Sequence, residues 1–273
     1  MQFRGARRKK QAAKATVTIN TVHKKEAVMA NAEQDPYRKS REHVIAALDL
    51  DTMDEALGVA RALTEEGVVT RFKIGSKLFT RCGPRILDRL GDLDAKVFLD
   101  LKYHDIPSVV GQACQEAARH EAVFLMTVHA LGGAKMVSRA MEGARAGRAC
   151  GEAPEVVAVT ALTSHAQEEV EALGVPLEIA SWAAKLGDLA MGAGASGLVC
   201  SAMEVADLRA RFPEATLVTP GIRPEGYGVK DDQTRVVTPA EALASGSTYL
   251  VIGRPIYRAR DPLQAATEIA RSL

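Results

Sequence analysis

The chain has 273 residues, of which 47% are hydrophobic and 25% are charged, a composition typical of a folded globular protein. Its formal charge of +1 conceals an uneven distribution, because residues 1–42 hold 11 Lys and Arg against 4 Asp and Glu, whereas the remainder holds 24 against 30. The acidic body argues against a nucleic-acid-binding surface, which would be basic. The four cysteines lack the spacing of a zinc site or a disulfide framework, and no apolar run reaches the roughly 18 residues of a membrane span, so we expect a cytoplasmic protein.

The beginning of the chain is basic and is expected to lie outside the fold. The first 25 positions hold no acidic residue, and they lack the continuous apolar stretch of a secretory signal. Three interpretations stay open: a disordered basic tail, a start codon assigned upstream of a true start at Met29, and an organelle-targeting segment. We therefore divide the chain into an extension with its linker, residues 1–40, and one domain, residues 41–273.

From His43 onward, short apolar runs alternate with amphipathic stretches, which is the pattern of successive βα units in a parallel sheet. Eight runs are expected to be strands: residues 43–50, 70–75, 96–101, 124–129, 156–162, 197–200, 216–221 and 249–253. The expected helical stretches include residues 53–66, 109–120, 134–146, 180–191, 204–211 and 262–273. Eight such units over about 230 residues predict a single-domain (β/α)8 TIM barrel, and no G-x-G-x-x-G follows the first strand as a dinucleotide-binding fold would require.

Polar residues gather where the expected strands end. These positions are Asp49, Lys73, Asp100 with Lys102, His129, Thr163 with Ser164, and the stretches 219–223 and 253–255. In a (β/α)8 barrel, the active site lies at the carboxyl ends of the strands and in the loops that follow them. We therefore expect this rim of the barrel to carry the chemistry.

The stretch FLDLKYHDIP brackets Lys102 between Asp100 and Asp105. Because Asp100 and Lys102 are two residues apart on an expected strand, their side chains should share one face about 7 Å apart along the chain, in the barrel mouth. Asp105 falls beyond the strand, where Pro107 suits the first turn of the next helix. Exposed ion pairs contribute only about 0–1 kcal/mol each, but charges that converge on a barrel rim favour a functional network, which would also include Lys73.

The motifs of the body resemble those of the bacterial-type orotidine 5'-phosphate decarboxylase family. The likeness rests on DLKYHDIP at 100–107 together with ALD at 47–49, FKIG at 72–75, LTS at 162–164, TPGIR at 219–223, DDQTR at 231–235 and IGRPI at 252–256. A lone D-x-K-x-x-D would be a weak signal, but ordered motifs at successive strand ends are specific. The resemblance implies a TIM barrel that converts orotidine 5'-phosphate to UMP and CO2 in de novo pyrimidine biosynthesis, without a cofactor or a metal.

The resemblance also implies roles for individual residues. Lys102 would protonate C6 of the pyrimidine, and Asp100 would lie against the substrate carboxylate. Lys73 would join the charge network and contact the ribose, and Asp105 would serve the site of a second subunit in a homodimer. The other expected substrate-binding residues are Asp49 at the ribose, Thr163 and Ser164 at the pyrimidine, Arg223 and Gln233 on the phosphate side, Gly253 and Arg254 at the 5'-phosphate, and Ile106.

Two other functions are compatible with these residues. Phosphosugar decarboxylases and aldolase-like enzymes of the same barrel superfamily resemble this pattern, but in their metal-dependent branch the position of Lys73 is a carboxylate that helps to hold Mg²⁺. A non-catalytic nucleotide-binding derivative is the second alternative. A pure binder has no need for a carboxylate that faces an anionic ligand, so the intact set of charges favours the decarboxylase.

Overall fold

The computed structural model describes residues 35–162, 165–224, 227 and 237–273, and the structural statements below concern those residues. The chain divides into two units, Met1–Arg38 and Lys39–Leu273, and the second unit contains every strand. Most of the expected extension falls on residues 1–34 and therefore lies outside the described residues.

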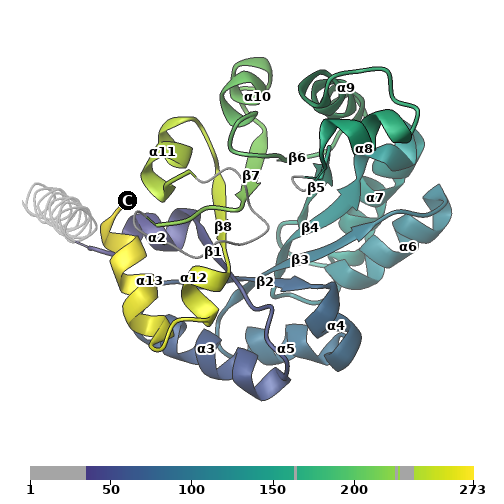
Figure 1. Cartoon of the computed structure of the whole chain (residues 1–273). Helices are drawn as coiled ribbons and strands as arrows, with labels where there is room; N and C mark the ends of the chain where they lie inside the picture. The colour runs from purple at the N-terminus through teal and green to yellow at the C-terminus, as the bar shows by residue number, and fades with distance from the viewer. Residues whose placement is uncertain (1–34, 163–164, 225–226, 228–236) are drawn as a thin grey trace, which may run out of the picture. The chain divides into compact units, whose positions relative to one another are not determined.

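Eight strands form one closed, parallel barrel (Figure 1). Each strand pairs with the next one along the chain, and the last pairs with the first. The predicted (β/α)8 fold is thereby confirmed. Two strands end about three residues earlier than predicted, because the chain leaves the ladder at the barrel mouth. The strands are β1 Val44–Ala47, β2 Arg71–Gly75, β3 Lys96–Tyr103, β4 Val123–His129, β5 Glu155–Val159, β6 Gly197–Val199, β7 Thr216–Pro220 and β8 Tyr249–Ile252.

Helices follow the strands and surround the barrel (Figure 1). Those that match the predicted stretches are α3 Met53–Glu65, α6 Pro107–Ala118, α7 Gly133–Gly147, α9 Ile179–Gly192, α10 Val205–Arg211 and α13 Pro262–Arg271. The shorter elements are α2 Arg38–His43, α4 Ser76–Cys82, α5 Arg85–Gly91, the 3₁₀ turn η1 Ala130–Gly132, α8 Gln167–Ala172, α11 Pro239–Ala244 and α12 Arg254–Tyr257.

Local sequence signals determine where several helices begin. Thr52 caps α3 because its hydroxyl accepts a hydrogen bond from Glu55 N at 3.2 Å, while Glu55 Oε2 accepts one from Thr52 N at 2.9 Å. Pro107 occupies the first turn of α6, as predicted, where its missing N–H leaves no bond unmade. These caps fix the points at which the rim loops end.

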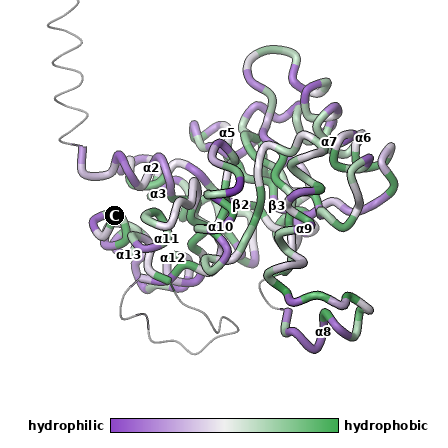
Figure 2. The backbone as a smooth tube through the Cα atoms, turned by 90° about the horizontal axis from the view of Figure 1, so that it is seen from above, coloured by the Kyte–Doolittle hydropathy of each residue, from purple (hydrophilic) through white to green (hydrophobic). Residues whose placement is uncertain are grey.

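The interior of the barrel is packed with apolar side chains. In Figure 2, hydrophobic colour is interrupted by hydrophilic colour along β2 and β3, whose sequences RFKIG and KVFLDLKY include charged residues, whereas α8 is largely hydrophilic. At the amino-terminal end of the barrel, the Arg71 guanidinium lies 5.7 Å from the ring centroids of both Phe124 and Tyr249, a cation–π arrangement. The central cluster consists of Ile45, Ala47, Phe98, Leu125, Val157, Val218 and Val251.

Helices α6 and α7 approach each other closely because glycines line their contact. A Cβ added to Gly143 would lie 2.0 Å from the carbonyl oxygen of Gly111, and one added to Gly147 would lie 2.1 Å from the carbonyl oxygen of Gln115. Backbone atoms cannot move aside as the end of a flexible side chain can. Since α6 follows β3 and α7 follows β4, this contact joins the two βα units next to the D-x-K-x-x-D motif.

We predict that Gly143→Ala lowers the free energy of unfolding by about 1–3 kcal/mol, because the added methyl overpacks the contact between α6 and α7. Urea denaturation measures the effect. The matched control is Gly58→Ala in α3, where an added Cβ meets nothing within 4 Å and the higher helix propensity of Ala should leave stability unchanged or slightly raised. Equal stability of the two variants would contradict the prediction.

Candidate active site

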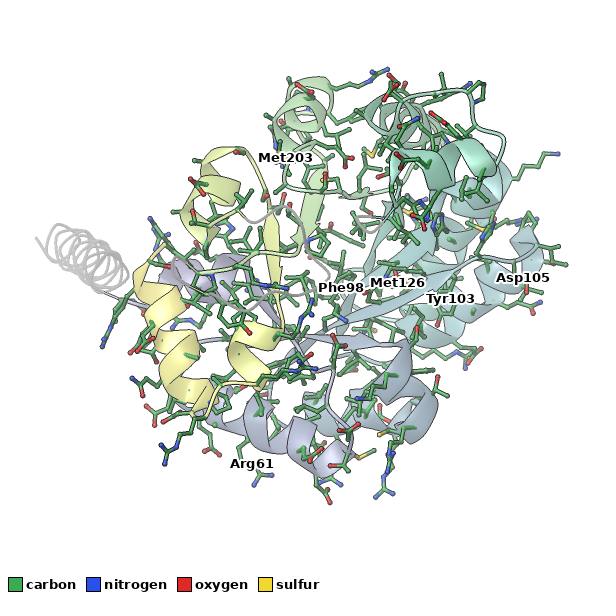
Figure 3. All side chains as sticks on the ribbon, in the orientation of Figure 1. Arg61, Phe98, Tyr103, Asp105, Met126 and Met203 are labelled. Carbon is green, nitrogen blue, oxygen red and sulfur yellow. The ribbon has the colours of Figure 1, made fainter. Side chains whose placement is uncertain are left out.

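A cavity of about 160 Å³ lies at the mouth of the barrel. Its lining comes from β2, β3 and β5 to β8, and from the segment directly after β5. Phe98 marks its position near the centre of the barrel in Figure 3. The lining residues are Lys73, Phe98, Asp100, Lys102, Val159, Ala161, Leu162, Val199, Val218, Pro220 and Val251.

The register of β2 against β3 brings the charged residues into this cavity. Lys73 pairs with Phe98, and Gly75, the last residue of β2, pairs with Asp100. Lys73 and Asp100 are therefore two residues apart in register. Laterally paired residues of neighbouring parallel strands direct their side chains to the same face. Gly75 leaves room for the charges, because a Cβ there would lie 2.9 Å from Lys73 Nζ and 3.2 Å from Asp49 Oδ1.

Two carboxylates and two ammonium groups alternate along one wall of the mouth. Lys73 Nζ lies 3.1 Å from Asp49 Oδ1 and 3.7 Å from Asp100 Oδ2. Lys102 Nζ donates to both oxygens of Asp100, at 2.8 and 2.9 Å. The side chains of Lys73 and Asp100 are each only 12% exposed, whereas that of Lys102 is 38% exposed. Lys102 is therefore the more accessible of the two cations that contact Asp100.

Strand β3 is irregular at the motif. Its register against β4 shifts between Leu99 and Tyr103, and Lys102 has a positive φ of 50°, which few residues other than glycine adopt. The backbone N–H of Lys102 donates to Thr127 Oγ1 at 2.8 Å, and the Thr127 hydroxyl donates to Asp100 Oδ1 at 3.1 Å. The regular alternation assumed from the sequence therefore does not hold, although Asp100 and Lys102 still line the same cavity.

The opposite wall of the cavity is apolar. It includes Val159, Val199, Val218 and Val251, which belong to β5, β6, β7 and β8. Apolar surroundings reduce the effective dielectric, so the charges on β2 and β3 act more strongly on a ligand than they would in water. The sequence alone did not reveal this wall, because aliphatic residues at strand ends resemble ordinary core.

Asp105 does not contact the four charged side chains at the barrel mouth. It is exposed between β3 and α6 and lies away from Phe98 in Figure 3. Its Oδ1 accepts a hydrogen bond from the backbone N of Ile106 at 2.6 Å. Among the described residues, the structure records no ion pair for Asp105. The Ile106 side chain is 62% exposed, which is unusual for a large aliphatic residue.

The predicted phosphate-side residues that the structure describes lie in the segments directly after β7 and β8. Gly253 directly follows β8, and Arg254 begins α12. Arg223 is 5% exposed, and its Nη1 donates to the Ile222 carbonyl at 3.0 Å. The guanidinium also lies 5.9 Å from the Tyr227 ring. Three predicted residues fall outside the described residues: Thr163, Ser164 and Gln233.

His129 ends β4 close to the charged wall. Burial, followed by the neighbouring charges of His104, Lys102 and His165, lowers its pKa from the ordinary 6.5 to about 4. Its ring stacks on that of His104 with 5.6 Å between centroids, and its Nδ1 accepts from Leu131 N at 3.5 Å. The ring is therefore neutral at pH 7.

Other features of the described residues do not define a competing site. No group of three or more His, Cys, Asp and Glu side chains there is arranged to hold a metal ion. Every described helix is too short or too polar to cross a membrane. Hollows of about 370 Å³ beside α9 and α10 and about 660 Å³ at the starts of β3 to β5 have none of the charged mouth residues in their linings.

The fold and the mouth together define a (β/α)8-barrel enzyme with a charged site at the carboxyl ends of its strands. Within that class, the chain belongs to the orotidine 5'-phosphate decarboxylase / HUMPS family, whose model matches residues 42–269.

Individual relatives cover nearly the same part of the chain. The orotidine 5'-phosphate decarboxylase of Saccharophagus degradans is 43% identical over 231 residues, which are 84% of this chain and 94% of that protein. The one from Chromohalobacter salexigens is 45% identical over 231 residues, 84% of this chain and 95% of its own. The crystal structure of orotidine 5'-phosphate decarboxylase from Lactobacillus acidophilus matches with a TM-score of 0.75 and 34% identity, covering 85% of this chain and 100% of that one.

We predict that acidification destabilises the protein partly through His129. Between pH 6.5 and about 4 the unfolded chain binds a proton on this ring that the folded chain does not, so the free energy of unfolding falls as the pH falls. His129→Asn keeps an acceptor near Leu131 N but cannot titrate, so its stability should fall less steeply across that window. Urea denaturation at several pH values measures both slopes, and identical slopes would contradict the prediction.

Proposed function

We propose that this chain decarboxylates orotidine 5'-phosphate to UMP and CO2 in pyrimidine biosynthesis. The observation that carries the proposal is the cavity with a charged wall, containing Lys73, Asp100 and Lys102, and an apolar wall opposite. A flat pyrimidine with a carboxylate on one edge suits such a cavity, because the ring packs on aliphatic groups while its charged edge reaches the ammonium groups. Membership of the family, and relatives of that name at 43% and 45% identity, support the same substrate.

Lys102 is the proton donor in this proposal. The bond between C6 and the carboxylate breaks, CO2 leaves, and the electron pair stays on C6. The Lys102 ammonium then transfers one proton to C6, and the resulting amine regains a proton from solvent. The bonds from Lys102 to Asp100 support this role, because they hold the ammonium in place before substrate arrives. One preorganised donor of this kind contributes about 3–4 kcal/mol to catalysis.

Asp100 acts on the group that leaves. Placed beside the substrate carboxylate, it disfavours the bound ground state, and the repulsion disappears as CO2 departs. Lys73 limits this unfavourable contact, since its ammonium lies 3.7 Å from Asp100 Oδ2. Binding energy from the phosphate, which is remote from C6, offsets the remainder.

The other substrate contacts follow the rim of the barrel. Because β8 pairs with β1, the residues after β8 lie beside the segment that carries Asp49, so one ligand can contact both. Gly253 offers a backbone N–H and Arg254 a guanidinium, groups that bind phosphate well. The proposed set is Asp49 and Lys73 at the ribose, Thr163 and Ser164 at the pyrimidine, Arg223, Gln233, Gly253 and Arg254 around the phosphate, and Ile106.

The two alternative functions have less support. A metal-dependent phosphosugar enzyme needs carboxylates free to bind Mg²⁺, but the Lys73 ammonium lies within 3.1 Å of Asp49 and 3.7 Å of Asp100. A non-catalytic nucleotide binder would gain nothing from Asp100 beside an anionic ligand. We therefore propose a reaction that needs neither a metal nor a cofactor.

A homodimer would complete the site. Asp105 lies apart from the mouth of its own subunit, and large apolar side chains are unusually exposed on the segments after β3 and β4: Ile106 is 62% exposed, Val109 43% and Leu131 44%. A second copy that covers these side chains would bury apolar area, and it would place Asp105 of one subunit at the barrel mouth of the other. Four cysteines without disulfides support a cytoplasmic location, where thiols stay reduced.

We predict that Lys102→Ala lowers kcat for orotidine 5'-phosphate by at least about 10³-fold while UMP still binds, because the proton donor is lost but the phosphate and ribose contacts stay. Loss of substrate absorbance measures turnover, and calorimetry measures UMP binding. Lys96→Ala, at the opposite end of the same strand, is the control and should keep wild-type kcat. Turnover near the wild-type rate in Lys102→Ala would remove Lys102 from this role.

The same assay separates the decarboxylase from the metal-dependent alternative. Wild-type protein treated with EDTA should keep full activity on orotidine 5'-phosphate, because no step of the proposed reaction passes through a metal. Activity that disappears on chelation and returns with Mg²⁺ would favour the phosphosugar branch of the family.

We predict that mixing Asp105→Ala with Lys102→Ala subunits restores activity that neither variant has alone. In a mixed dimer, one site carries both substitutions and the other carries none, so random exchange should recover up to about a quarter of wild-type activity. The measurement is turnover before and after subunit exchange, with each variant alone as the baseline. Failure to recover activity, in dimers shown to have exchanged, would count against a shared site.

A further inference from the structure

Thr127 is a buried polar residue in β4, a strand that is otherwise apolar up to His129 at its end. It lies in β4 within the run FLMTVH and is 0% exposed, with the buried Met126 and Val128 on either side of it. A hydroxyl buried in this way requires hydrogen-bond partners. Thr127 finds two, and both belong to the charged motif of the neighbouring strand.

The first partner is the backbone of Lys102. Leu99 pairs with Met126, and the next pair is Tyr103 with Val128. β3 therefore has two more residues than β4 between these pairs, and the regular hydrogen bonding of the two strands is interrupted. Across the interruption, the N–H of Lys102 donates to Thr127 Oγ1 at 2.8 Å. The hydroxyl thereby takes the place of a backbone carbonyl and supports Lys102 in its positive-φ conformation.

The second partner is the carboxylate of Asp100. The Thr127 hydroxyl donates to Asp100 Oδ1 at 3.1 Å, and the same oxygen accepts from Lys102 Nζ at 2.8 Å. One hydroxyl therefore orients both the residue that carries the ammonium and the carboxylate that holds it. Thr127 is absent from the lining of the mouth cavity, so it acts through these two residues and does not itself touch a ligand there.

We propose that Thr127 is a positioning residue for the decarboxylation, and that its hydroxyl fixes the irregular turn of β3 so that the Lys102 ammonium is aimed at the reacting carbon. The inference rests on the proposed function. It assigns Thr127 to the chemical step, because the residues it orients act on C6 and on the leaving carboxylate, whereas the ribose and phosphate contacts lie on other strands.

Kinetics of Thr127→Val and Thr127→Ser test the inference. Valine has nearly the same shape as threonine but neither donates nor accepts, so kcat should fall about 10- to 100-fold, as expected when a hydrogen bond to a charged group is lost. KM for orotidine 5'-phosphate and the Kd for UMP should stay within about threefold of wild type, since binding groups are untouched. Serine keeps the hydroxyl, so Thr127→Ser should recover most of kcat.

The matched control is Thr248→Val. Thr248 Oγ1 also accepts a backbone N–H from a neighbouring strand, that of Leu217 at 3.0 Å, but it precedes β8 at the amino-terminal end of the barrel. Its loss should lower the thermal midpoint and leave kcat within about twofold of wild type, because no mouth residue depends on it.

Several outcomes would overturn the inference. Wild-type kcat in Thr127→Val would do so, as would an equal loss of kcat in the Val and Ser variants or in Thr248→Val. A rise in KM and Kd without a fall in kcat would place Thr127 in binding instead. If Thr127→Val does not fold, Thr127→Cys, whose thiol is a weak donor and acceptor, is judged by the same criteria. A wild-type protein inactive on orotidine 5'-phosphate would instead overturn the proposed function.

Discussion

The contact between Lys102 and Asp100 is the interaction on which the candidate site depends. A carboxylate that is 12% exposed accepts two hydrogen bonds from one ammonium, and a second ammonium, that of Lys73, lies 3.7 Å away. Removing Asp100 would leave the Lys102 ammonium without its ion-pair partner, and removing either lysine would leave the buried Asp100 carboxylate with only one ammonium beside it, which is costly in an apolar cavity. The arrangement also suits the proposed reaction, because its cations are held beside a carboxylate and face an aliphatic wall.

Closure of the barrel is what makes this arrangement available. The parallel register of β2 and β3 sets Lys73 beside Phe98 and Asp100 beside Gly75, and the missing side chain of Gly75 leaves space for the charges. Valines from β5 to β8 complete the cavity from the other side, which only a closed sheet allows. The glycine contacts of α6 and α7 join the two βα units that supply Asp100, Lys102 and Thr127.

In the proposed reaction, the fixed ammonium of Lys102 has two tasks. Decarboxylation at C6 develops negative charge on one carbon, and a fixed cation there stabilises the transition state more than the ground state. The same Lys102 ammonium supplies the proton in the proposed reaction. One correctly placed side chain therefore serves both purposes, and no additional group is needed. Asp105 does not fit this picture within a single subunit, and its separation from the mouth, next to exposed Ile106, supports a second copy as part of the complete enzyme.

The amino-acid sequence alone was enough to predict the eight strands, their order, the rim on which the candidate site lies and the family that the motifs resemble. This was possible because short apolar runs, amphipathic stretches and the D-x-K-x-x-D spacing are local properties of the chain. Four features became visible only in the folded protein: the irregular turn at Lys102, its support from Thr127, the apolar wall, and the position of Asp105 outside the cavity lining. Each of these depends on the register between strands far apart in sequence. The threonine in FLMTVH was visible as a polar residue in a buried strand, but only the pairing of β3 with β4 identifies its partners.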